Sequence, residues 1–374
     1  MPSRARASVN LAAIGRNTAR IAQAAPTAAV CAVVKADAYG HGMVPVARTV
    51  LAGGATWLAV ATAGEAAGLR AAGIEARVLV LGVLSDEELR IALAARADVV
   101  AWSAAFVARV AQLGGGRVHV KLDTGLGRLG ERDPAVATGV AEAAAAAAAV
   151  ELSGLLTHFA TADERGDAFF GEQLGRFCTW VQPLRARFPQ AIVHAANSAA
   201  TLRDPACHFD LVRPGVALYG LDPFGEDPAA EGLEPALELR SYLGEVKDCA
   251  AGESVGYGRR FIATTPTRIA TVPVGYGDGW RRGLTNNAEV LVGGRRLPLV
   301  GTVSMDNVTL DVGPGADGPD VGEEAVLIGA QGDERILAEE VARRLGTINY
   351  EVTCGISGRV PRHHHRDGAP VEGA

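Results

Sequence analysis

Apolar and polar positions follow two alternating patterns along the first 220 residues. Short, nearly continuous apolar runs are separated by stretches that have apolar residues at helical spacing. The apolar runs are 28–35, 56–62, 77–82, 97–102, 117–125, 152–159, 192–198 and 211–220. The helical stretches are 8–24, 42–53, 64–72, 86–95, 104–112, 134–149 (which holds an alanine tract) and 167–188. Strands that are apolar on both faces and joined by helices are typical of a parallel sheet, and eight of them predict a (β/α)8 barrel.

The pattern changes after residue 235. Shorter strands of alternating polarity follow, separated by Gly, Pro and Asp, and one stretch, 336–346, has helical spacing. The strands are expected within 238–246, 268–275, 288–294, 295–303, 307–313 and 324–329. Proline, glycine and acidic residues cluster in 224–239, between the two patterns. The sequence therefore predicts an α/β fold with a TIM-type barrel domain, 1–235, and a mainly β domain, 236–374.

Composition excludes several classes of protein. A 48% hydrophobic and 21% charged composition is ordinary for a globular protein, and a net charge of −6 without a basic stripe argues against nucleic-acid binding. Apolar runs are too short for a membrane helix, and the basic segment 1–17 is a poor secretory signal. The five scattered cysteines form no CxxC pair, which indicates reduced thiols in the cytoplasm. No Gly-x-Gly-x-x-Gly follows the first strand, which argues against a dinucleotide site.

The histidine run 363–365 is expected to be a solvated tail rather than a metal site, and we predict no metal ion elsewhere in the chain.

Polar side chains stand where five of the predicted strands end. They are Lys35, the segment Asp123 to Arg128, His158, the pair Asn197 and Ser198, and the segment Arg213 to Gly215. Because the carboxyl ends of barrel strands meet at one mouth, where barrel enzymes carry their chemistry, we expect a functional pocket there. Each residue also has a simpler explanation: Lys35 could cap a strand and His158 could lie in the core. Arg213 could pair with Asp210.

The chemistry of this polar set suggests a ligand. Ser198 and the backbone amides at Gly215 and Val216 would form a cradle for an anion. A lysine such as Lys35 loses charge on burial and can then attack a carbonyl group. An anion site beside a reactive amine makes pyridoxal phosphate the candidate cofactor.

Eight motifs, in order along the chain, resemble the alanine racemase family. They are AVVKADAYGHG (32–42), KLDTGLGRLG (121–130), HAANSAA (194–200), LVRPGVALYG (211–220), GYGRRF (256–261), PVGYGDGW (273–280), GTVSMDN (301–307) and INYEVTC (348–354). The resemblance covers nearly the whole chain. It implies a pyridoxal-phosphate enzyme that interconverts L- and D-alanine and supplies D-alanine for peptidoglycan.

The resemblance also implies roles at the cofactor. Lys35 would carry it as an internal aldimine, and His158 would lie against its ring. Arg213 would face the pyridine nitrogen, and since arginine keeps its proton, the ring would be a weaker electron sink than one paired with a carboxylate. The other implied cofactor-binding residues are Tyr39, Asn197, Ser198, Gly215, Val216 and Tyr350.

Racemisation needs one base on each face of the α-carbon. The resemblance assigns Lys35 to the proton of the D-enantiomer and Tyr257 to that of the L-enantiomer; without it, Tyr257 would be an aromatic residue packing a hairpin. Arg128 would bind the substrate carboxylate. Lys121 matches a lysine that is carbamylated in many relatives, and the carbamate would hold Arg128 in place.

Residues of the β domain would complete the site. The resemblance places Tyr276, Met305 and Asp306 at the substrate, and it implies a head-to-tail homodimer in which each β domain serves the partner's barrel. Ser304 stands where many relatives carry cysteine.

Three rival functions stay open at this point. A barrel-type decarboxylase would use the same cofactor, but Arg213 in place of a carboxylate argues against it. A racemase for serine is the second rival. A cofactor carrier is the third, and Tyr257 argues against it because a carrier needs no second base. For Asp37 and His41 we expect only packing or helix-start roles.

Overall fold

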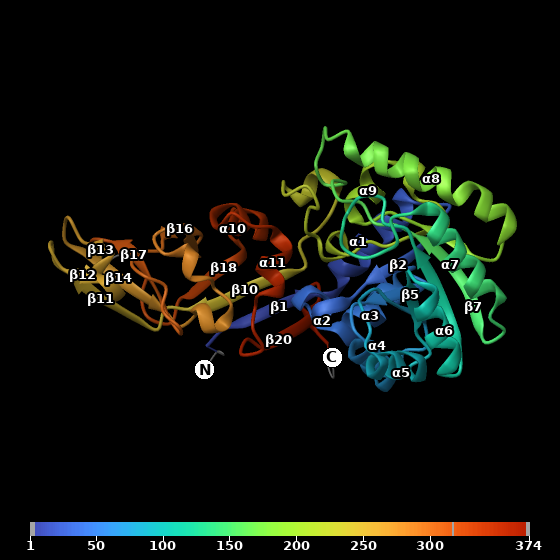
Figure 1. Ribbon diagram of the computed structural model, residues 1–374. Helices are drawn as coiled ribbons and strands as arrows, with labels where there is room; N and C mark the ends of the chain where they lie inside the picture. The colour runs from blue at the N-terminus through green and yellow to red at the C-terminus, as the bar shows by residue number, and fades with distance from the viewer. Residues whose placement is uncertain (1–3, 316–317, 372–374) are drawn as a thin grey trace.

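The structure is a computed structural model that describes residues 4–315 and 318–371. Figure 1 shows two units: a barrel surrounded by helices, coloured blue to green, and an elongated unit of strands that is mostly orange and red.

The barrel is one parallel sheet of eight strands, so the predicted fold class is confirmed. In chain order the strands are β2 (Ala29–Val33), β3 (Trp57–Val60), β4 (Arg77–Val80), β5 (Asp98–Ala101), β6 (Gly116–Lys121), β7 (Val150–Leu156), β8 (Ile192–His194) and β9 (Leu211–Val212). Each pairs with the next in order from β2 to β8, and β9 pairs with β2. The amide of Asp210 donates to Val193 O at 3.0 Å and that of Arg213 to Ala196 O at 2.8 Å, which brings the two ends of the sheet together.

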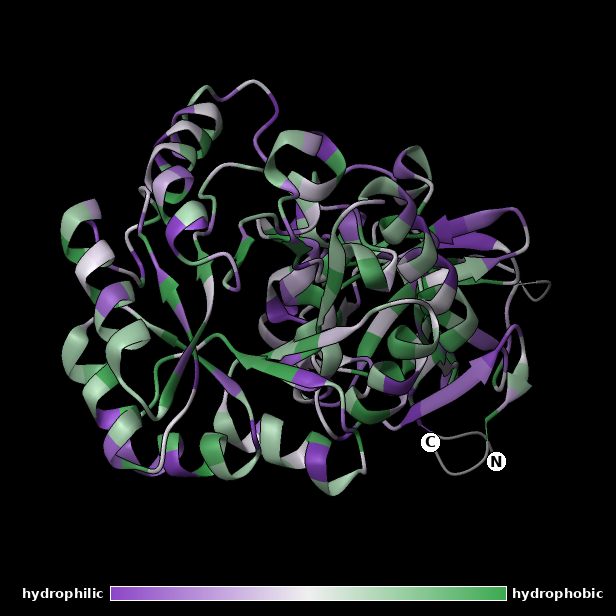
Figure 2. Ribbon diagram, turned by 90° about the vertical axis from the view of Figure 1, so that its right-hand side faces the viewer, coloured by the Kyte–Doolittle hydropathy of each residue, from purple (hydrophilic) through white to green (hydrophobic). Residues whose placement is uncertain are grey.

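Helices cover the outside of the barrel, as predicted. They are α1 (Leu11–Ala24), α3 (Met43–Ala52), α4 (Ala63–Ala71), α5 (Asp86–Ala94), α6 (Ala104–Gln112), α7 (Pro134–Ala146), α8 (Phe169–Arg187) and the short α9 (Ser198–Arg203). The first part of the alanine tract lies in α7, on the outer layer, and this helix ends at Ala146 rather than at the predicted residue 149 (Figure 1). The barrel strands consist mostly of hydrophobic residues, whereas the surrounding helices mix hydrophobic and hydrophilic residues (Figure 2).

The prediction of one helix over 8–24 was wrong at its start. Residues Arg6–Asn10 form strand β1, and α1 begins only at Leu11. The side chain of Asn10 accepts hydrogen bonds from the amides of Ala12 and Ala13, and such a cap ends the strand and starts the helix. β1 is part of the sheet of the other unit, so the chain begins in that unit before it enters the barrel.

The second unit is built on a mixed sheet, in which β1 and β20 are parallel and the other neighbouring strands are antiparallel. Its strands are β16 (Arg295–Pro298), β15 (Glu289–Val292), β18 (Glu324–Gln331), β10 (Leu237–Tyr242), β1, β20 (Arg362–Arg366) and β21 (Ala369–Pro370), in that spatial order, with β19 (Glu334–Ile336) beside β18. Smaller sheets hold β11 (Glu245–Cys249), β14 (Thr267–Val272) and β17 (Val308–Gly313), and β12 (Ser254–Val255) with β13 (Phe261–Ile262). Strands are found in all six segments predicted after residue 235, but the segment 238–246 holds the end of β10 and the start of β11, which belong to different sheets.

Two predictions for the C-terminal part were wrong. The sequence predicted one helix after residue 235, and α10 (Ala338–Leu345) is that helix. A second helix, α11 (Asn349–Cys354), was missed because it is too short for its periodicity to be recognised in the sequence. The histidine run is no solvated tail, since it lies in β20 and pairs parallel to β1. In the described parts of the chain, no helix is long and apolar enough to cross a membrane.

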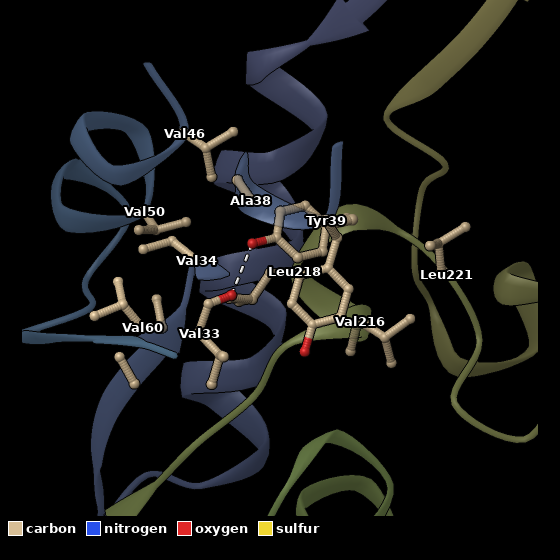
Figure 3. Packing of buried hydrophobic residues seen from close by; sticks show 14 of the residues in the cluster. Val33, Val34, Ala38, Tyr39, Val46, Val50, Val60, Val216, Leu218 and Leu221 are labelled. Atoms are coloured by element: carbon tan, nitrogen blue, oxygen red, sulfur yellow. Dashed lines mark hydrogen bonds between the residues drawn. The ribbon is translucent and has the colours of Figure 1, made fainter. Parts of the chain in front are cut away.

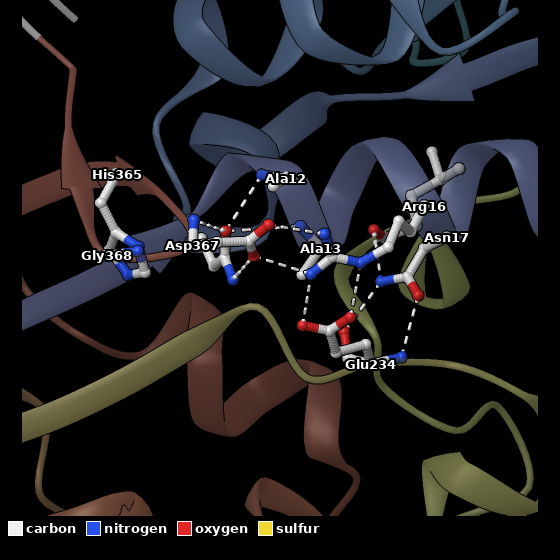
Figure 4. Close-up of polar contacts among 10 residues, drawn as sticks. Ala12, Ala13, Arg16, Asn17, Glu234, His365, Asp367 and Gly368 are labelled. Atoms are coloured by element: carbon white, nitrogen blue, oxygen red, sulfur yellow. Dashed lines mark hydrogen bonds and ion pairs between the residues drawn. The ribbon is translucent and has the colours of Figure 1, made fainter.

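Polar contacts join the two units at the start of α1 (Figure 4). Arg16 donates to Glu234 at 2.7 and 2.8 Å and to Asp367 at 2.9 Å. Asn17 accepts from the amide of Glu234 and donates to its carbonyl, each at 2.9 Å. One turn of α1 therefore holds both the segment that leaves the barrel and the turn after β20.

Candidate active site

A cavity of about 580 Å³ opens at the carboxyl ends of the barrel strands. Eleven of the residues singled out in the sequence contribute to its lining: Lys35, Tyr39, Lys121, Arg128, His158, Asn197, Ser198, Arg213, Gly215, Val216 and Tyr350. The strand ends thus bring together the polar residues that the sequence scatters over 316 positions. Tyr257, Tyr276, Met305 and Asp306 are not part of this lining.

Lys35 enters the cavity on an unusual turn. β2 ends at Val33, and Ala36, Asp37, Ala38 and Tyr39 all have φ between 52° and 55°, in the left-handed region. This conformation costs about 1–2 kcal/mol per residue. Hydrogen bonds hold it: Ala36 N donates to Glu65 Oε1 at 2.6 Å, and Met43 N donates to Asp37 Oδ1 at 2.7 Å. The strained turn sets Lys35 and Tyr39 on the same wall of the cavity.

The surroundings of Lys35 disfavour its charged form. Burial lowers the pKa of its ammonium group, and the positive charge of Arg128 lowers it further. A lysine with a lowered pKa has a larger fraction of free amine, which is the form that attacks a carbonyl.

Tyr39 is buried between aromatic and aliphatic residues of the barrel (Figure 3). Its ring centroid lies 4.9 Å from that of Tyr219, whose hydroxyl donates to Val33 O at 2.7 Å. His41 stacks on the other side of this cluster, 4.6 Å from the Tyr219 ring. The expected packing role of His41 is therefore confirmed, as is the helix-start role of Asp37 at Met43.

The loop after β9 packs against Tyr39 and Ser198. Ser198 Oγ accepts from the amides of Gly215 at 2.9 Å and Ala217 at 3.3 Å. A Cβ atom on Gly215 would lie 2.5 Å from the Tyr39 hydroxyl, so only glycine allows this approach. Asn197 caps α9 through Ala200 N at 3.0 Å. Two hydroxyl groups and a glycine backbone thus meet where a phosphate was expected, and the Gly215 amide itself points to Ser198.

Arg213 is only 3% exposed and forms four hydrogen bonds within the barrel. Nη1 donates to His194 Nδ1 at 2.8 Å, and Nη2 donates to Thr157 O, Ala195 O and His158 Nδ1 at 2.8–3.1 Å. Burial lowers its pKa to about 10, so the guanidinium stays charged near neutral pH. Asp210, the simpler partner considered above, pairs with Arg185 at 2.6 Å instead.

His158 is held neutral. Burial, followed by the charge of Arg213, holds its pKa well below the usual range of histidine. A neutral imidazole can accept from Arg213 through Nδ1, as the 3.1 Å contact requires.

Lys121 and Arg128 stand on the opposite wall. Lys121 ends β6 and is buried, which together with the charges of Arg213 and Arg128 lowers its pKa to about 8. Arg128 lies on the following loop, which Asp123 organises by accepting from the amides of Gly125 and Gly127 at 3.0–3.1 Å. Two basic side chains are therefore presented to the cavity, whose lining also includes the carboxylate of Glu351.

The second unit contributes one wall of the same cavity. α11 carries Tyr350, whose ring lies 6.0 Å from that of Tyr39. α11 packs closely on the left-handed turn, since a Cβ atom on Gly40 would lie 2.4 Å from Thr353 O. Tyr350 is thus brought to the cavity within one chain.

The remaining four residues gather on a different surface of the second unit. Tyr276 N donates to Ser304 O at 3.0 Å, and Thr302 Oγ1 donates to Tyr257 O at 2.6 Å, which places these segments side by side. Asp306 accepts from Arg359 at 2.7 Å. Tyr257 is 74% exposed, Tyr276 42% and Met305 52%. We call Tyr257, Tyr276 and Met305 the exposed trio.

Several polar residues around the cavity were not anticipated. Glu65 holds the turn at Ala36, and His119, His194 and Asp98 continue the contacts of Arg213 through the barrel interior. The pattern RVHVK held a signal, because in a strand His119 lies on the same face as Lys121. A partly desolvated lysine among hydroxyl, arginine and histidine side chains at a barrel mouth defines an enzyme of the (β/α)8 class.

Comparisons with known proteins narrow this class. Residues 9–223 match the family model "Alanine racemase, N-terminal domain", and residues 236–364 match "Alanine racemase, C-terminal domain". An alanine racemase of Frankia casuarinae is 43% identical over 366 residues, 95% of each chain. One of Geobacillus stearothermophilus is 42% identical over 95% of this chain and 92% of the relative. The chain belongs to the alanine racemase family.

Solved structures agree. The alanine racemase of D-cycloserine-producing Streptomyces lavendulae aligns with a TM-score of 0.92 at 38% identity, over 98% of each chain. That of Bacillus anthracis, solved with bound L-Ala-P, aligns with a TM-score of 0.90 at 38% identity, over 100% of this chain and 97% of the other.

Proposed function

We propose that this protein is an alanine racemase that uses pyridoxal phosphate and interconverts L- and D-alanine. The observation that carries the proposal is that Lys35 and Arg213 line one cavity in a chain that matches the family over residues 9–223 and 236–364. A barrel-type decarboxylase needs a carboxylate at the pyridine nitrogen, so the buried guanidinium of Arg213 favours racemisation.

The residues of the cavity fit the proposed cofactor. The amine of Lys35 would hold its aldehyde carbon, and Ser198, Tyr39, Tyr350 and the Gly215–Val216 backbone would hold its phosphate. The close approach of Gly215 to the Tyr39 hydroxyl, which a Cβ atom would prevent, supports this assignment. When bound, pyridoxal phosphate acidifies the α-proton of an attached amino acid by drawing electrons into its ring.

The chain's own residues would move the proton. Lys35 Nζ would take or return it on one face of the α-carbon, and the Tyr257 hydroxyl would do so on the other. Arg128 would bind the substrate carboxylate through its planar pair of donors. Arg213 would face the ring nitrogen, with His158 against the ring. Asn197, which caps α9, would support the phosphate side.

Lys121 is a candidate for carbamylation. A neutral amine adds to carbon dioxide to form a carbamate and releases one proton, and the lowered pKa of Lys121, about 8, supplies neutral amine near physiological pH. The product would replace a buried cation beside Arg128 by an anion. Arg128 would then gain a charged acceptor that fixes its guanidinium.

The exposed trio supports a shared site. Tyr257, Tyr276 and Met305 lie outside the cavity and open to solvent, although a second base and a small substrate pocket must lie inside it. A head-to-tail homodimer, in which the trio and Asp306 of one chain close the cavity of its partner, satisfies both facts. Tyr276 and Met305 would then leave room for little more than a methyl side chain. The barrel, from Leu11 to about residue 235, would act as the barrel half of this site, and the second unit, which also holds β1, as the β half.

The proposed role is the supply of D-alanine for peptidoglycan in the bacterial cytoplasm. The five cysteines are all free, which fits a reducing compartment.

One incubation tests the proposal. The protein, pyridoxal phosphate and L-alanine are kept in deuterated water while optical rotation, α-deuteration and carbon dioxide are followed. We expect loss of rotation, deuteration of both enantiomers and no carbon dioxide, and serine as substrate should react more slowly because its side chain is larger. Release of carbon dioxide, or inertness towards both amino acids, would refute the proposal.

A further inference from the structure

A line of hydrogen-bonded side chains crosses the barrel interior behind the cavity. It starts at Arg213 Nη1, which donates to His194 Nδ1 at 2.8 Å. His194 Nε2 lies 2.8 Å from His119 Nδ1, and His119 Nε2 lies 3.0 Å from Asp98 Oδ2. His194, His119 and Asp98 are 0% exposed, and none of the three belongs to the cavity lining. We call these four residues the Arg213–Asp98 chain.

The positions of the hydrogens in this chain follow from its ends. Arginine only donates, so His194 Nδ1 accepts and the neutral ring carries its hydrogen on Nε2. That hydrogen points to His119 Nδ1, which leaves the hydrogen of His119 on Nε2, facing Asp98. Burial lowers the pKa of both histidines, which keeps them neutral. Each N–H group that forms a hydrogen bond within the Arg213–Asp98 chain therefore points from the Arg213 end towards Asp98.

The carboxylate at the far end is firmly anchored. Asp98 Oδ2 accepts from Arg77 Nη2, and Oδ1 accepts from Arg117 Nε, both at 2.6 Å. Burial opposes its ionisation, but the hydrogen bonds from His119 and Arg117 and the charge of Arg77 hold its pKa below the usual range. Arg77 also packs over the Trp57 ring at 4.0 Å. A fixed anion thus stands at the start of β5, at the end of the barrel opposite the cavity.

Such a line of residues costs free energy of folding, because four polar side chains are removed from water and each needs a hydrogen-bond partner. Apolar residues at the same positions would carry no such cost. Its geometry connects a buried anion, held by Arg77 and Arg117, with Arg213, which lines the cavity. Resting on the proposed function, we propose that Asp98 is a positioning residue that fixes the tautomers of His119 and His194 and thereby holds Arg213 oriented towards the cofactor's ring nitrogen.

Loss of the carboxylate has a defined consequence. An asparagine at position 98 can donate to His119 Nε2 and so move the hydrogen of that ring to Nδ1. His194 must then receive it on Nε2 and carry its own hydrogen on Nδ1, where it would face a hydrogen of Arg213 at 2.8 Å. Two donors cannot share that position, so Arg213 would have to move away from His194.

The test compares Asp98→Asn with Ser153→Ala in the full-length protein. Ser153 is buried at the same end of the barrel and contacts Arg77 at 3.2 Å, but has no hydrogen bond to the Arg213–Asp98 chain. Nitrogen-15 spectra of histidine-labelled protein report the tautomer of each ring, and His119→Gln and His194→Gln assign the signals. We expect Nε2–H tautomers for His119 and His194 in the wild type and in Ser153→Ala, and their loss in Asp98→Asn.

Kinetics provide the second readout. In Asp98→Asn we expect kcat to fall about 10- to 100-fold, with KM for alanine within about twofold because Arg128 is untouched, and a shifted absorbance maximum of the bound cofactor. Ser153→Ala should leave all three unchanged. An Nδ1–H tautomer of His119 or His194 in the wild type would overturn the proposal, and this result does not require Asp98→Asn to fold. If Asp98→Asn folds and keeps the kcat and the cofactor absorbance of the wild type, the proposal is also wrong. An inactive wild type would refute the proposed racemase and leave the tautomer result standing.

Discussion

The two halves of the candidate site differ in how they are held. On the barrel, Ser198 and Arg213 are fixed by hydrogen bonds within one chain, and Arg213 alone makes four. The turn that carries Lys35 is held by hydrogen bonds of Ala36 and Asp37. On the second unit, Tyr257 and Tyr276 stand on short turns and are 74% and 42% exposed. The first half is organised before any partner or ligand binds, whereas the second presents large side chains to water.

This difference suggests how the site is divided. Polar groups can be ordered inside a barrel because strand ends converge there and supply backbone acceptors. A cluster of exposed aromatic and methionine side chains gains stability only when another surface covers it. The comparison therefore predicts that chemistry depends on the barrel half first, and on the second unit only through a partner.

Removal of the barrel amine is the largest expected effect. Lys35→Ala loses both the covalent anchor of the cofactor and one base, so activity should fall about 10⁴-fold or more. Absorbance of the protein-bound cofactor and racemase rate measure the two losses separately. Lys247→Ala, which alters an exposed lysine paired with Glu245 on β11, is the control and should keep both. Full activity of Lys35→Ala would remove this residue from the mechanism.

A mixed dimer tests the division directly. Tyr257→Phe removes one hydroxyl from the exposed trio and should lower racemisation about 10²- to 10⁴-fold while cofactor absorbance stays. A heterodimer of Lys35→Ala and Tyr257→Phe subunits, purified through two different tags, should recover about half of the wild-type activity, since one of its two sites is intact.

Homodimers of either variant serve as controls for that experiment. If both bases came from the same chain, each site of the heterodimer would carry one defect, and no activity would return.

A third prediction concerns Lys121, which belongs to the barrel half of the site. Lys121→Ala removes the group proposed to hold Arg128, and we expect activity about 10- to 100-fold lower, with partial recovery on addition of a small carboxylate such as acetate or formate. Chloride at equal ionic strength is the control. Wild-type activity of Lys121→Ala without any added carboxylate would contradict the proposed carbamate.

The smallest effect concerns stability rather than chemistry. Burial lowers the pKa of His41 to about 4 in the folded chain, against about 6.5 when unfolded. The unfolded state therefore binds the proton first, so stability is complete above pH 6.5 and falls by about 3 kcal/mol as pH drops towards 4. His41→Gln should flatten the pH dependence of the urea midpoint between pH 6.5 and 4.5. His363→Gln, at an exposed position, should leave that slope as in the wild type.

Much of the barrel could be predicted because its signals are local. Eight apolar runs and the helices between them are visible as periods of hydrophobicity, and the convergence of strand ends at one mouth predicts that Lys35, His158, Ser198 and Arg213 lie together. The same reasoning failed for Arg6–Asn10 and for the histidine run, because these strands pair with each other across more than 350 positions, and Arg6–Asn10 pairs also with the distant β10.

The sequence by itself determined the order of elements, the barrel and the residue types at its mouth, since burial imposes these periods on neighbouring residues. The tertiary structure decided the left-handed turn at Ala36–Tyr39, which depends on Glu65, and the line from Arg213 to Asp98, which joins four different strands or strand ends. It also decided that Tyr350 reaches the cavity within the chain whereas Tyr257 does not. These features arise from contacts between distant segments, and such contacts leave no period in the sequence.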